Sequence, residues 1–529
     1  MAWAPGLALF LVIGWAAAIY LHWPALTDYA IYKSDIRQTP HWAAYHSDTF
    51  RDDDLLIHYG AFNQSPVQNL IYWLGTYLID MVLLTKSVAV ISYGLCSGLF
   101  FLVGWSMFGW SGGALLGLFF TFFPDQFDYF AGGFSKMWMI PLLLIAVWIL
   151  DKKAWKWLPV LMIFSAVAYP MTAVLIGLLV FFYLVLDFLD SGRNLTKGLG
   201  YLLLGSLVAI IPLMIKYGSP EPRIGPMTPG SVLMEMEEMY RGGTADYLPL
   251  PSLGYALSRP LQNGFVALSA ILFFLILGRS KIHWRRSWTA LLVASMTGYV
   301  LSSAFFMHFY IPNRYTRYSM AVLLALWQAA NWSRVLSRIP RMPLRIGAVV
   351  LLLVGGAIAY RDTFQMGKDT GNRSEVVPLN AALGSLPPKV LIAGHPSYLD
   401  DVGVLARRSV LVNYKMSHPW FSDYYAEIKQ RTEDTFRAIY SPNLAGVNQL
   451  HRKYGVTHLV LVKKHFRRGR FKARDLYVRP YNDFIYELTR KPQPLALAPP
   501  PPSSIVYEDD LYYVLSLPIR AAGKSEVPR

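Results

Sequence analysis

The sequence has 529 residues, of which 54% are hydrophobic, 15% aromatic and only 16% charged. A soluble protein carries about a quarter charged residues, and here the apolar residues gather in runs close to the ~20 residues that cross a hydrocarbon core. The composition excludes a soluble globular protein and predicts a polytopic membrane protein. The net charge of +16 falls largely in short loops, which follows the positive-inside rule and gives no reason to expect a nucleic-acid partner. Cys96 is the only cysteine, which excludes disulfides.

About eleven apolar segments are predicted to be transmembrane helices. Several are short, and prolines mark ends or kinks in them. In chain order they are 4–22, 86–108, 112–124, 136–150, 157–170, 172–189, 198–216, 262–278, 288–308, 318–333 and 345–360.

Eleven helices place four basic loops on one side of the membrane, and the positive-inside rule makes that side the cytoplasm. These loops are 151–156, 191–197, 278–287 and 333–345. The opposite face receives a first outer loop (21–85), a turn (124–136), a long outer loop (217–261), a turn (310–317) and the chain after about 361. Residues 66–84 contain Gln68, Asn69 and Asp80, and we interpret them as a helix on the outer membrane surface.

The composition changes after the last apolar segment. Short β-like runs at 389–394, 408–413 and 457–464 are bounded by turn residues, and 503–517 has the pattern of a hairpin. Residues 420–440 have the period of an amphipathic helix. The predicted fold is therefore an α-helical transmembrane domain (1–360) followed by a soluble extracytoplasmic α/β domain (361–529).

Asp35 is the first candidate functional residue. It follows the first helix at once, and Thr39 and Pro40 mark the start of the next helix. A carboxylate at the membrane surface can act as a general base on a hydroxyl that arrives from the aqueous side, or it can bind a divalent cation. The structural alternative is that Asp35 and Arg37 are solvated loop charges.

Further acidic residues lie on the same outer face. Three adjacent carboxylates in the stretch RDDD (51–54) repel one another, so at least one needs a cation, a basic side chain or a helix end. Asp53 and Asp54 are the candidate metal ligands. Asp125 and Asp128 stand in the turn 124–136, where a proline ends an apolar segment, and turn chemistry is the alternative to a functional role.

Arg314 and Arg317 begin an apolar segment on the outer side, against the positive-inside bias. Arginine can hold a phosphate with two parallel hydrogen bonds, and its charge does not titrate away. Snorkelling to lipid headgroups is the structural alternative.

The layout resembles that of the GT-C glycosyltransferases, the polytopic enzymes that use polyprenyl-phosphate-linked sugars. The resemblance lies in the acidic outer loop after the first helix, its surface helix, the second acidic turn, the long outer loop and the C-terminal outer domain. The stretch SDIRQTPHW (34–42) is also similar to the corresponding stretch of uncharacterised bacterial members of this superfamily. The sequence departs from many members in having Ile36 where an Asp-Glu pair would place Glu, and it has no WWDYG motif, which argues against an oligosaccharyltransferase.

The resemblance implies an inverting transfer of a sugar from a polyprenyl-phosphate donor in the lipid bilayer to a glycan, lipid or protein acceptor. It places Asp35 at the catalytic acidic position, with Asp125 or Asp128 as the second-loop carboxylate. Arg314 and Arg317 would bind the donor phosphate, and Arg37, Gln38 and His41 are candidate substrate-binding residues. A divalent cation, Mg²⁺ or Mn²⁺, is a candidate cofactor, and the expected location is a bacterial inner membrane. The alternatives are a transporter or flippase for a lipid-linked glycan and a non-catalytic envelope assembly protein.

Overall fold

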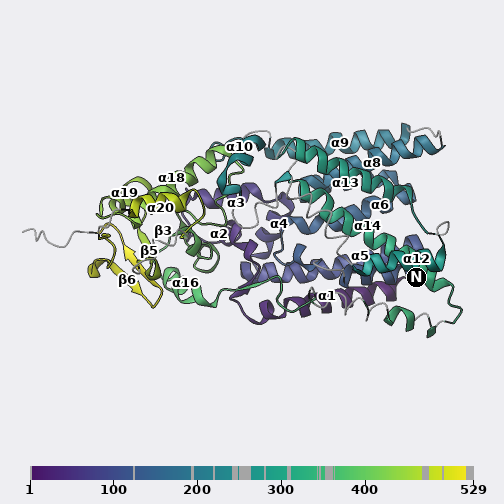
Figure 1. Ribbon diagram of the computed structural model, residues 1–529, viewed down its shortest axis with the longest axis horizontal. Coiled ribbons are helices and arrows are strands. Elements are labelled where there is room, and N and C mark those ends of the chain that lie inside the picture. The colour runs from purple at the N-terminus through teal and green to yellow at the C-terminus, as the bar shows by residue number, and fades with distance from the viewer. Residues whose placement is uncertain are drawn as a thin grey trace, which may run out of the picture.

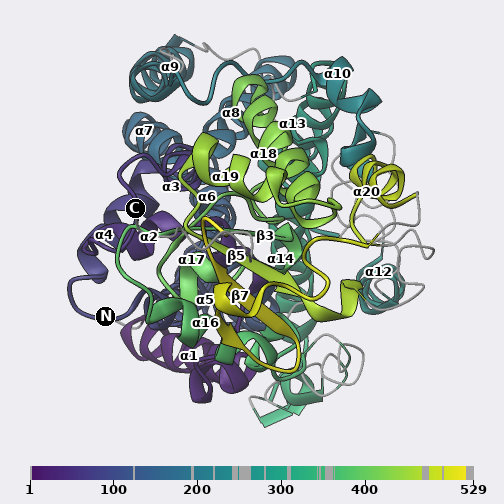
Figure 2. The same cartoon turned by 90° about the vertical axis from the view of Figure 1, so that its left-hand side faces the viewer.

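The computed structural model describes most of the chain. Near-parallel helices form a bundle, and a smaller unit that contains a β-sheet lies at one end of it, opposite the N-terminus (Figure 1). In Figure 2 this unit faces the viewer and stands in front of the helix ends. The prediction of a mostly helical protein with a C-terminal α/β part is confirmed. The described residues are 3–122, 126–191, 196–217, 221–240, 248–249, 264–278, 282–306, 311–341, 343–344, 347–351, 355, 362, 364–466, 476–490 and 494–519.

Nine apolar helices build the described part of the bundle. Four of them, α1, α5, α8 and α9, are long and apolar enough to cross a membrane. The predicted segment 345–360 falls mostly outside the described residues, so the number of about eleven spans stays a prediction. The helices are α1 (Ala4–Thr27), α5 (Met81–Phe122), α6 (Met139–Lys152), α7 (Leu158–Ala168), α8 (Pro170–Ser191), α9 (Thr196–Tyr217), α12 (Gly264–Leu277), α13 (Arg286–Ala304) and α14 (Pro312–Ser337).

The long helix α5 is a hairpin of two antiparallel helices, as the separate segments 86–108 and 112–124 predicted. The reversal lies at Gly109, whose φ of +78° is the left-handed conformation that glycine adopts without steric cost. Across the hairpin, Ser97 Oγ lies 2.8 Å from Thr121 Oγ1, and the Tyr93 hydroxyl donates to the Thr121 carbonyl at 2.7 Å. Small residues thus let the two halves pack closely.

Ion pairs join the helix ends remote from the α/β unit. Arg285, just before α13, pairs with Asp151 of α6 at 2.8 Å and donates to the Met107 carbonyl of α5 at 3.1 Å. Arg286 pairs with Asp190 of α8 at 2.8 Å. The basic residues of this end therefore neutralise carboxylates as well as following the predicted charge bias.

The first outer loop forms β1 (Ile31–Tyr32), the 3₁₀ turn η1 (Ser34–Gln38), α2 (Pro40–Ala44), α3 (Leu55–Asn63) and α4 (Pro66–Gly75). Helix α4 exposes Leu70, Trp73 and Leu74 while it buries Gln68. The Gln68 amide contacts the Gly133 carbonyl and accepts from Trp138 Nε1 at 3.2 Å. The polar residues that argued against a transmembrane helix therefore bind α4 to its neighbours.

The C-terminal unit is built on a mixed five-stranded sheet in the order β4-β3-β5-β7-β6. Strand β3 is parallel to β4 and β5, while β7 is antiparallel to β5 and β6. Hydrophobic clusters cover both faces, so β3 and β5 are buried throughout. The strands are β3 (Leu391–Gly394), β4 (Ser409–Val410), β5 (His458–Val462), β6 (Ile505–Glu508) and β7 (Tyr512–Ser516); the helices are α16 (Val377–Gly384), α17 (Val402–Leu405), α18 (Ser422–Ile439), α19 (Ala445–Tyr454) and α20 (Tyr481–Thr489).

Two connections bind the C-terminal unit to the bundle's outer loops. Strand β1 pairs with β2 (Gly371–Asn372), so the first outer loop and the start of the C-terminal unit share a small antiparallel sheet. The long outer loop forms α10 (Gly230–Glu235) and η5 (Glu237–Tyr240), and Thr228 N donates to the Trp420 carbonyl at 2.9 Å beside the start of α18. The domain limits at 360 and 361 stay a prediction.

The Gly133→Ala variant should be less stable than wild type. Gly133 has a φ of +63°, and the Tyr72 hydroxyl occupies the position that a Cβ would take. We expect a loss of about 1–3 kcal/mol, the usual cost of a strained backbone at such a residue. Thermal unfolding in detergent, followed by tryptophan fluorescence, measures it. Gly200→Ala is the control, because open space surrounds that position in α9, and an equal effect in both variants would contradict the prediction.

Candidate active site

The candidate site lies where the first outer loop, the turn after α5 and the start of α14 meet, at the end of the bundle that carries the C-terminal unit. Asp35 belongs to η1. Asp128 belongs to the 3₁₀ turn η2 (Phe127–Tyr129) and Lys136 to η3 (Ser135–Trp138). Arg317 lies in the second turn of α14. The segments that carry Asp35, Asp128 and Arg317 are far apart in sequence, and the fold brings these three predicted residues into one cluster.

Two linked sets of ion pairs form this cluster. Lys136 Nζ lies 3.0 Å from Asp35 Oδ2. Lys33 pairs with Asp128, and Arg317 Nη2 lies 3.3 Å from Asp128 Oδ2. The Arg317 guanidinium also donates from Nε to the Tyr129 hydroxyl at 2.7 Å and lies over the Tyr129 ring. Both carboxylates therefore have cationic partners from other segments.

Both carboxylates are ionised at neutral pH. Burial alone would raise the pKa of Asp35, but Lys136, Lys33 and Lys415 outweigh burial and hold that pKa below its usual range. The same competition, with Lys136 and Lys33 against burial, lowers the pKa of Asp128 to about 2. Opposite charges a few ångströms away favour the ionised form in this way.

Several cations gather around the two carboxylates. Lys33, Lys136 and Arg317 interact electrostatically with the carboxylates. Lys415 also interacts with Asp35, and Arg314 lies close enough to Lys136 to repel it. Among the described residues, Lys33, Lys136 and Arg317 contact the two carboxylates directly, and Lys415 also faces Asp400. The paired side chains are only 15–28% exposed, so bulk water screens their charges weakly. The site is suited to an anion such as a phosphate.

Arg314 stands one turn before Arg317 in α14. Its Nη1 donates to the Tyr318 hydroxyl at 2.9 Å. Asp125, the other predicted acidic residue of the second turn, lies outside the described residues.

Arg37, Gln38 and His41 have different surroundings. The Arg37 guanidinium faces the C-terminal unit, where Nη1 donates to Asp400 Oδ2 at 3.1 Å. Gln38 ends η1 and is half-buried. His41 is buried in α2, where its Nε2 lies 3.1 Å from Asn69 Oδ1, and burial lowers the pKa of His41 to about 3. His41 is therefore neutral and packs the first outer loop.

Asp53 and Asp54 each have a partner that offsets the repulsion expected among the adjacent carboxylates of the RDDD stretch. Arg51 holds Asp53 through two hydrogen bonds, of 2.8 and 2.9 Å. Asp54 is the N-cap of α3 and accepts from Leu56 N at 2.9 Å and Ile57 N at 3.2 Å. In the part of the chain that the structure describes, no three His, Cys, Asp or Glu side chains are grouped as a metal site requires.

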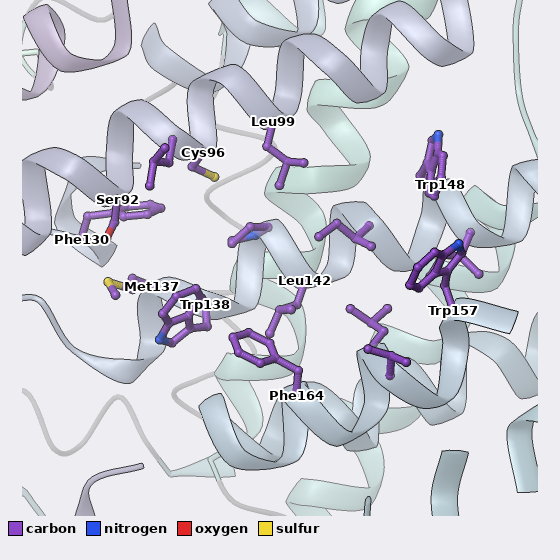
Figure 3. A pocket seen from close by; sticks show the side chains of 16 residues that line it. Ser92, Cys96, Leu99, Phe130, Met137, Trp138, Leu142, Trp148, Trp157 and Phe164 are labelled. Atoms are coloured by element: carbon purple, nitrogen blue, oxygen red, sulfur yellow. The ribbon is translucent and has the colours of Figure 1, made fainter. Parts of the chain in front are cut away.

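An apolar groove of about 610 Å³ begins beside the charged cluster. Residues of α5, α6, α7 and the turn before α6 line it, and Ser92 and Cys96 are among its few polar side chains. Figure 3 shows Phe130, Met137 and Trp138 at one end and Trp148 and Trp157 at the other. Phe130 and Met137 are sequence neighbours of Asp128 and Lys136, so this end of the groove lies near the cationic site.

Sequence reasoning missed Lys33, Lys136 and Lys415 as site residues. Lysines at the membrane surface are common snorkelling residues, and nothing in their spacing shows which carboxylate each will meet. Lys33 and Lys136 do carry one signal, because both lie on the predicted outer side, against the charge bias that places basic residues in the cytoplasm.

Comparison with known proteins finds similarity in structure only. No protein-family model and no curated protein matches the sequence. The structure of ArnT from Cupriavidus metallidurans bound to undecaprenyl phosphate is similar over 97% of this chain and 98% of its own, at 14% identity and a TM-score of 0.45. The oligosaccharyltransferase of Archaeoglobus fulgidus in complex with Zn and sulfate is similar over 88% of this chain and 69% of its own, at 10% identity and a TM-score of 0.49. The archaeal oligosaccharyltransferase AglB, with an inhibitory peptide and a dolichol-phosphate, has 12% identity, a TM-score of 0.46 and coverage of 88% and 70%.

Similarity to GT-C glycosyltransferases thus extends across most of the chain, as the layout of the sequence indicated. At 10–14% identity and with TM-scores below 0.5, it identifies neither a substrate nor a catalytic residue of this protein.

Substitutions of Asp54 should show whether this residue acts as a helix cap or as a metal ligand. Asn caps a helix as well as Asp does, whereas Ala does not. We expect Asp54→Asn to unfold near the wild-type temperature and Asp54→Ala to lose about 1 kcal/mol. Thermal unfolding with and without Mg²⁺ or Mn²⁺ is the measurement. A metal-dependent stabilisation of wild type that Asp54→Asn abolishes would contradict the capping role.

Proposed function

We propose that this protein is a membrane glycosyltransferase that moves a sugar from a polyprenyl-phosphate donor to an acceptor hydroxyl at the outer face of a membrane, with inversion at the anomeric carbon. The observation that supports it best is a half-buried cluster of lysine and arginine side chains around Asp35 and Asp128, whose sequence neighbours Phe130 and Met137 line one end of an apolar groove. A lipid phosphate has the matching chemistry, an anionic head on a long apolar tail.

The groove provides a place for the donor's tail. Since the tail already lies in the hydrocarbon core of the bilayer, van der Waals packing against the groove, and not transfer from water, would hold it there. Because Met137 lines one end of the groove, a tail whose head lies at that end brings its phosphate close to Lys136 and its neighbours. The lipid and its charge are then held by different parts of the same site.

Asp35 is the proposed general base. It is half-buried and its lowered pKa keeps it ionised, the form that a base needs, and a carboxylate in this form can accept a proton from a hydroxyl that approaches from the aqueous side. As the acceptor oxygen bonds to the anomeric carbon, the bond from that carbon to the phosphate oxygen breaks, and the hydroxyl proton passes to Asp35. A single displacement of this kind inverts the anomeric centre.

The cations stabilise the leaving group. Charge grows on the polyprenyl phosphate as its bond to the sugar breaks, and fixed donors nearby lower the energy of that state. Arg317, Arg314 and Lys136 are the proposed donors. Arg317 is held by Asp128 and Tyr129, so it needs little reorganisation when charge develops.

The described residues do not fit a bound divalent cation at this point. A metal site needs several oxygen ligands with spare negative charge, whereas Lys33, Lys136 and Arg317 already neutralise Asp35 and Asp128. We therefore assign charge stabilisation to the lysine and arginine side chains. We also place the C-terminal unit on the extracytoplasmic side of a bacterial inner membrane, opposite the basic loops.

Asp35→Asn should abolish glycosyl transfer. Loss of a general base typically costs 10²–10⁴-fold, roughly the range expected for kcat. Purified protein in nanodiscs, supplied with radiolabelled polyprenyl-phosphate sugars and envelope glycan acceptors, gives the measurement. Asp48→Asn, an exposed carboxylate of the same outer loop, is the matched control and should behave as wild type. Equal transfer by Asp35→Asn and wild type would remove Asp35 from the role, and donor translocation without transfer would favour the flippase.

Leu95→Trp should weaken the use of long-chain donors. Leu95 lines the groove and is 54% exposed, so an indole there fills the groove without disturbing the core. We expect KM for an undecaprenyl donor to rise about tenfold, equal to roughly 1.4 kcal/mol of lost contact, and KM for a donor with two isoprene units to stay unchanged. Val12→Trp on α1, 58% exposed away from the groove, is the control. A rise in KM for both donors would mean that the groove does not hold the tail.

A further inference from the structure

A nearly buried network of ion pairs joins the first outer loop to the C-terminal unit, and its arginine belongs to the same turn as Asp35. Arg37 Nη1 lies 3.1 Å from Asp400 Oδ2 and 3.7 Å from Asp401 Oδ2, and these three side chains are only 10%, 4% and 8% exposed. The Tyr32 hydroxyl donates to Asp401 Oδ1 at 2.6 Å. One arginine of the outer loop therefore meets two adjacent carboxylates of the C-terminal unit.

Each partner is fixed on its own side of the contact. Arg37 Nε donates to the Ser34 carbonyl at 3.1 Å, which closes the turn that carries Asp35. Asp400 Oδ1 accepts from Lys415 N at 2.8 Å, so the loop after β4 holds this carboxylate in place. Asp400 and Asp401 stand between β3 and α17, and α17 itself packs on α2 and η1.

We infer that Asp400 and Asp401 are positioning residues for Asp35. Through Arg37 they hold the Ser34–Gln38 turn in the conformation that sets the Asp35 carboxylate against Lys136. This inference rests on the proposed function, in which Asp35 is the base. Misplacement of a reacting group by about 1 Å can cost 10²-fold in rate, so a residue that only orients the turn affects turnover strongly.

The charge state of Asp400 makes the contact sensitive to pH. Burial raises the pKa of Asp400 to about 6, although Arg37 opposes this effect. Asp400 also faces Asp401 and Lys415, and Arg373 lies 4.0 Å from Asp401. Because the folded-state pKa is raised, Asp400 takes up a proton as pH falls through about 6, and its attraction for Arg37 then weakens. The ionised, positioning form is complete only above that pH.

Disulfide trapping tests the docking without any enzymatic assay. Ile31 of β1 and Asn372 of β2 are cross-strand partners, and Cys96 is the only native cysteine. In a Cys96→Ala background, Ile31→Cys and Asn372→Cys should cross-link rapidly on mild oxidation. Addition of Asp400→Asn or Arg37→Met should slow the cross-link by about tenfold or more, because the first leaves Arg37 only its 3.7 Å contact with Asp401 and the second leaves two buried carboxylates without their shared arginine.

The control removes a different ion pair between the same two segments. Asp52 lies 2.9 Å from Lys389, but these side chains are 88% and 52% exposed, and exposed pairs contribute little. Asp52→Asn should cross-link at the wild-type rate. Cross-linking of the Asp400→Asn protein at the wild-type rate would overturn the inference, whether or not the protein is a glycosyltransferase.

Measurement of turnover in the Asp400→Asn variant then distinguishes a positioning role of Asp400 from a general effect on the stability of the protein. In Asp400→Asn we expect kcat for transfer to fall about tenfold or more with donor KM unchanged, and the acid limb of the kcat–pH profile near pH 6 to disappear. Oxidation of the Ile31→Cys/Asn372→Cys pair in that variant should restore kcat, and reduction should reverse the gain. Persistent low kcat after complete cross-linking, or a change in KM alone, would overturn the inference. Size-exclusion and thermal unfolding check the fold of each variant. Absence of turnover in wild type itself would count against the proposed function, and the cross-linking result would still stand.

Discussion

The outer end of this protein depends on the compensation of two half-buried carboxylates by cations from other segments. Asp35 pairs with Lys136, and Asp128 pairs with Lys33 and Arg317. These contacts join the first outer loop, the turn after α5 and the start of α14. A partly buried charge without an opposite charge nearby costs folding free energy. Each segment is therefore held where its charged side chain contacts its partner. Loop segments that could otherwise move are thereby bound to the helix bundle.

A second layer of uncharged contacts supports this arrangement. Helix α4 lies on the bundle through Gln68, which contacts the Gly133 carbonyl, and through Tyr72, which stacks on Trp42 at 3.5 Å between ring centroids. Asn69 accepts from Trp42 Nε1 at 3.2 Å and lies beside His41. The turn that carries Asp128 and Lys136 is thus braced by the same outer loop that carries Asp35. Stacked aromatic pairs of this kind are worth about 0.5–1.5 kcal/mol beyond the area that they bury.

The elements with a strong local signal were predictable from the sequence. The apolar runs predicted α1, the two halves of α5, α8 and α9, and alternation with turn residues predicted β3, β5 and the β6–β7 hairpin. The surface helix followed from Gln68 and Asn69, because amides in a lipid-facing helix would lack partners. The number of membrane spans was harder to predict, because several helices are shorter than the thickness of the hydrocarbon core and their ends depend on neighbouring elements.

The site was predictable only for residues whose position alone is unusual. Asp35, Asp128 and Arg317 stood out because they lie on the outer face at the ends of apolar segments, and the fold does bring them together. Arg37 was grouped with them by proximity in sequence, yet its side chain meets Asp400, more than 360 residues away. Local spacing contains no information on such a partner. The same holds for Lys136 and Lys415, and for the caps and pairs that account for Asp53 and Asp54.

The proposed phosphate site rests on several cations that gather around two half-buried carboxylates. Lysine and arginine side chains that are held close together repel one another, and this repulsion costs folding energy where no anion offsets it. A bound anion removes part of this repulsion between the cations. The energy of that repulsion therefore adds to the affinity of the site for an anion. The groove beside Met137 adds a requirement for apolar mass next to the anion. In the proposed function, the base, the phosphate site and the tail groove thus come from three different parts of the fold, and a lipid-linked sugar is the kind of ligand that would use all three.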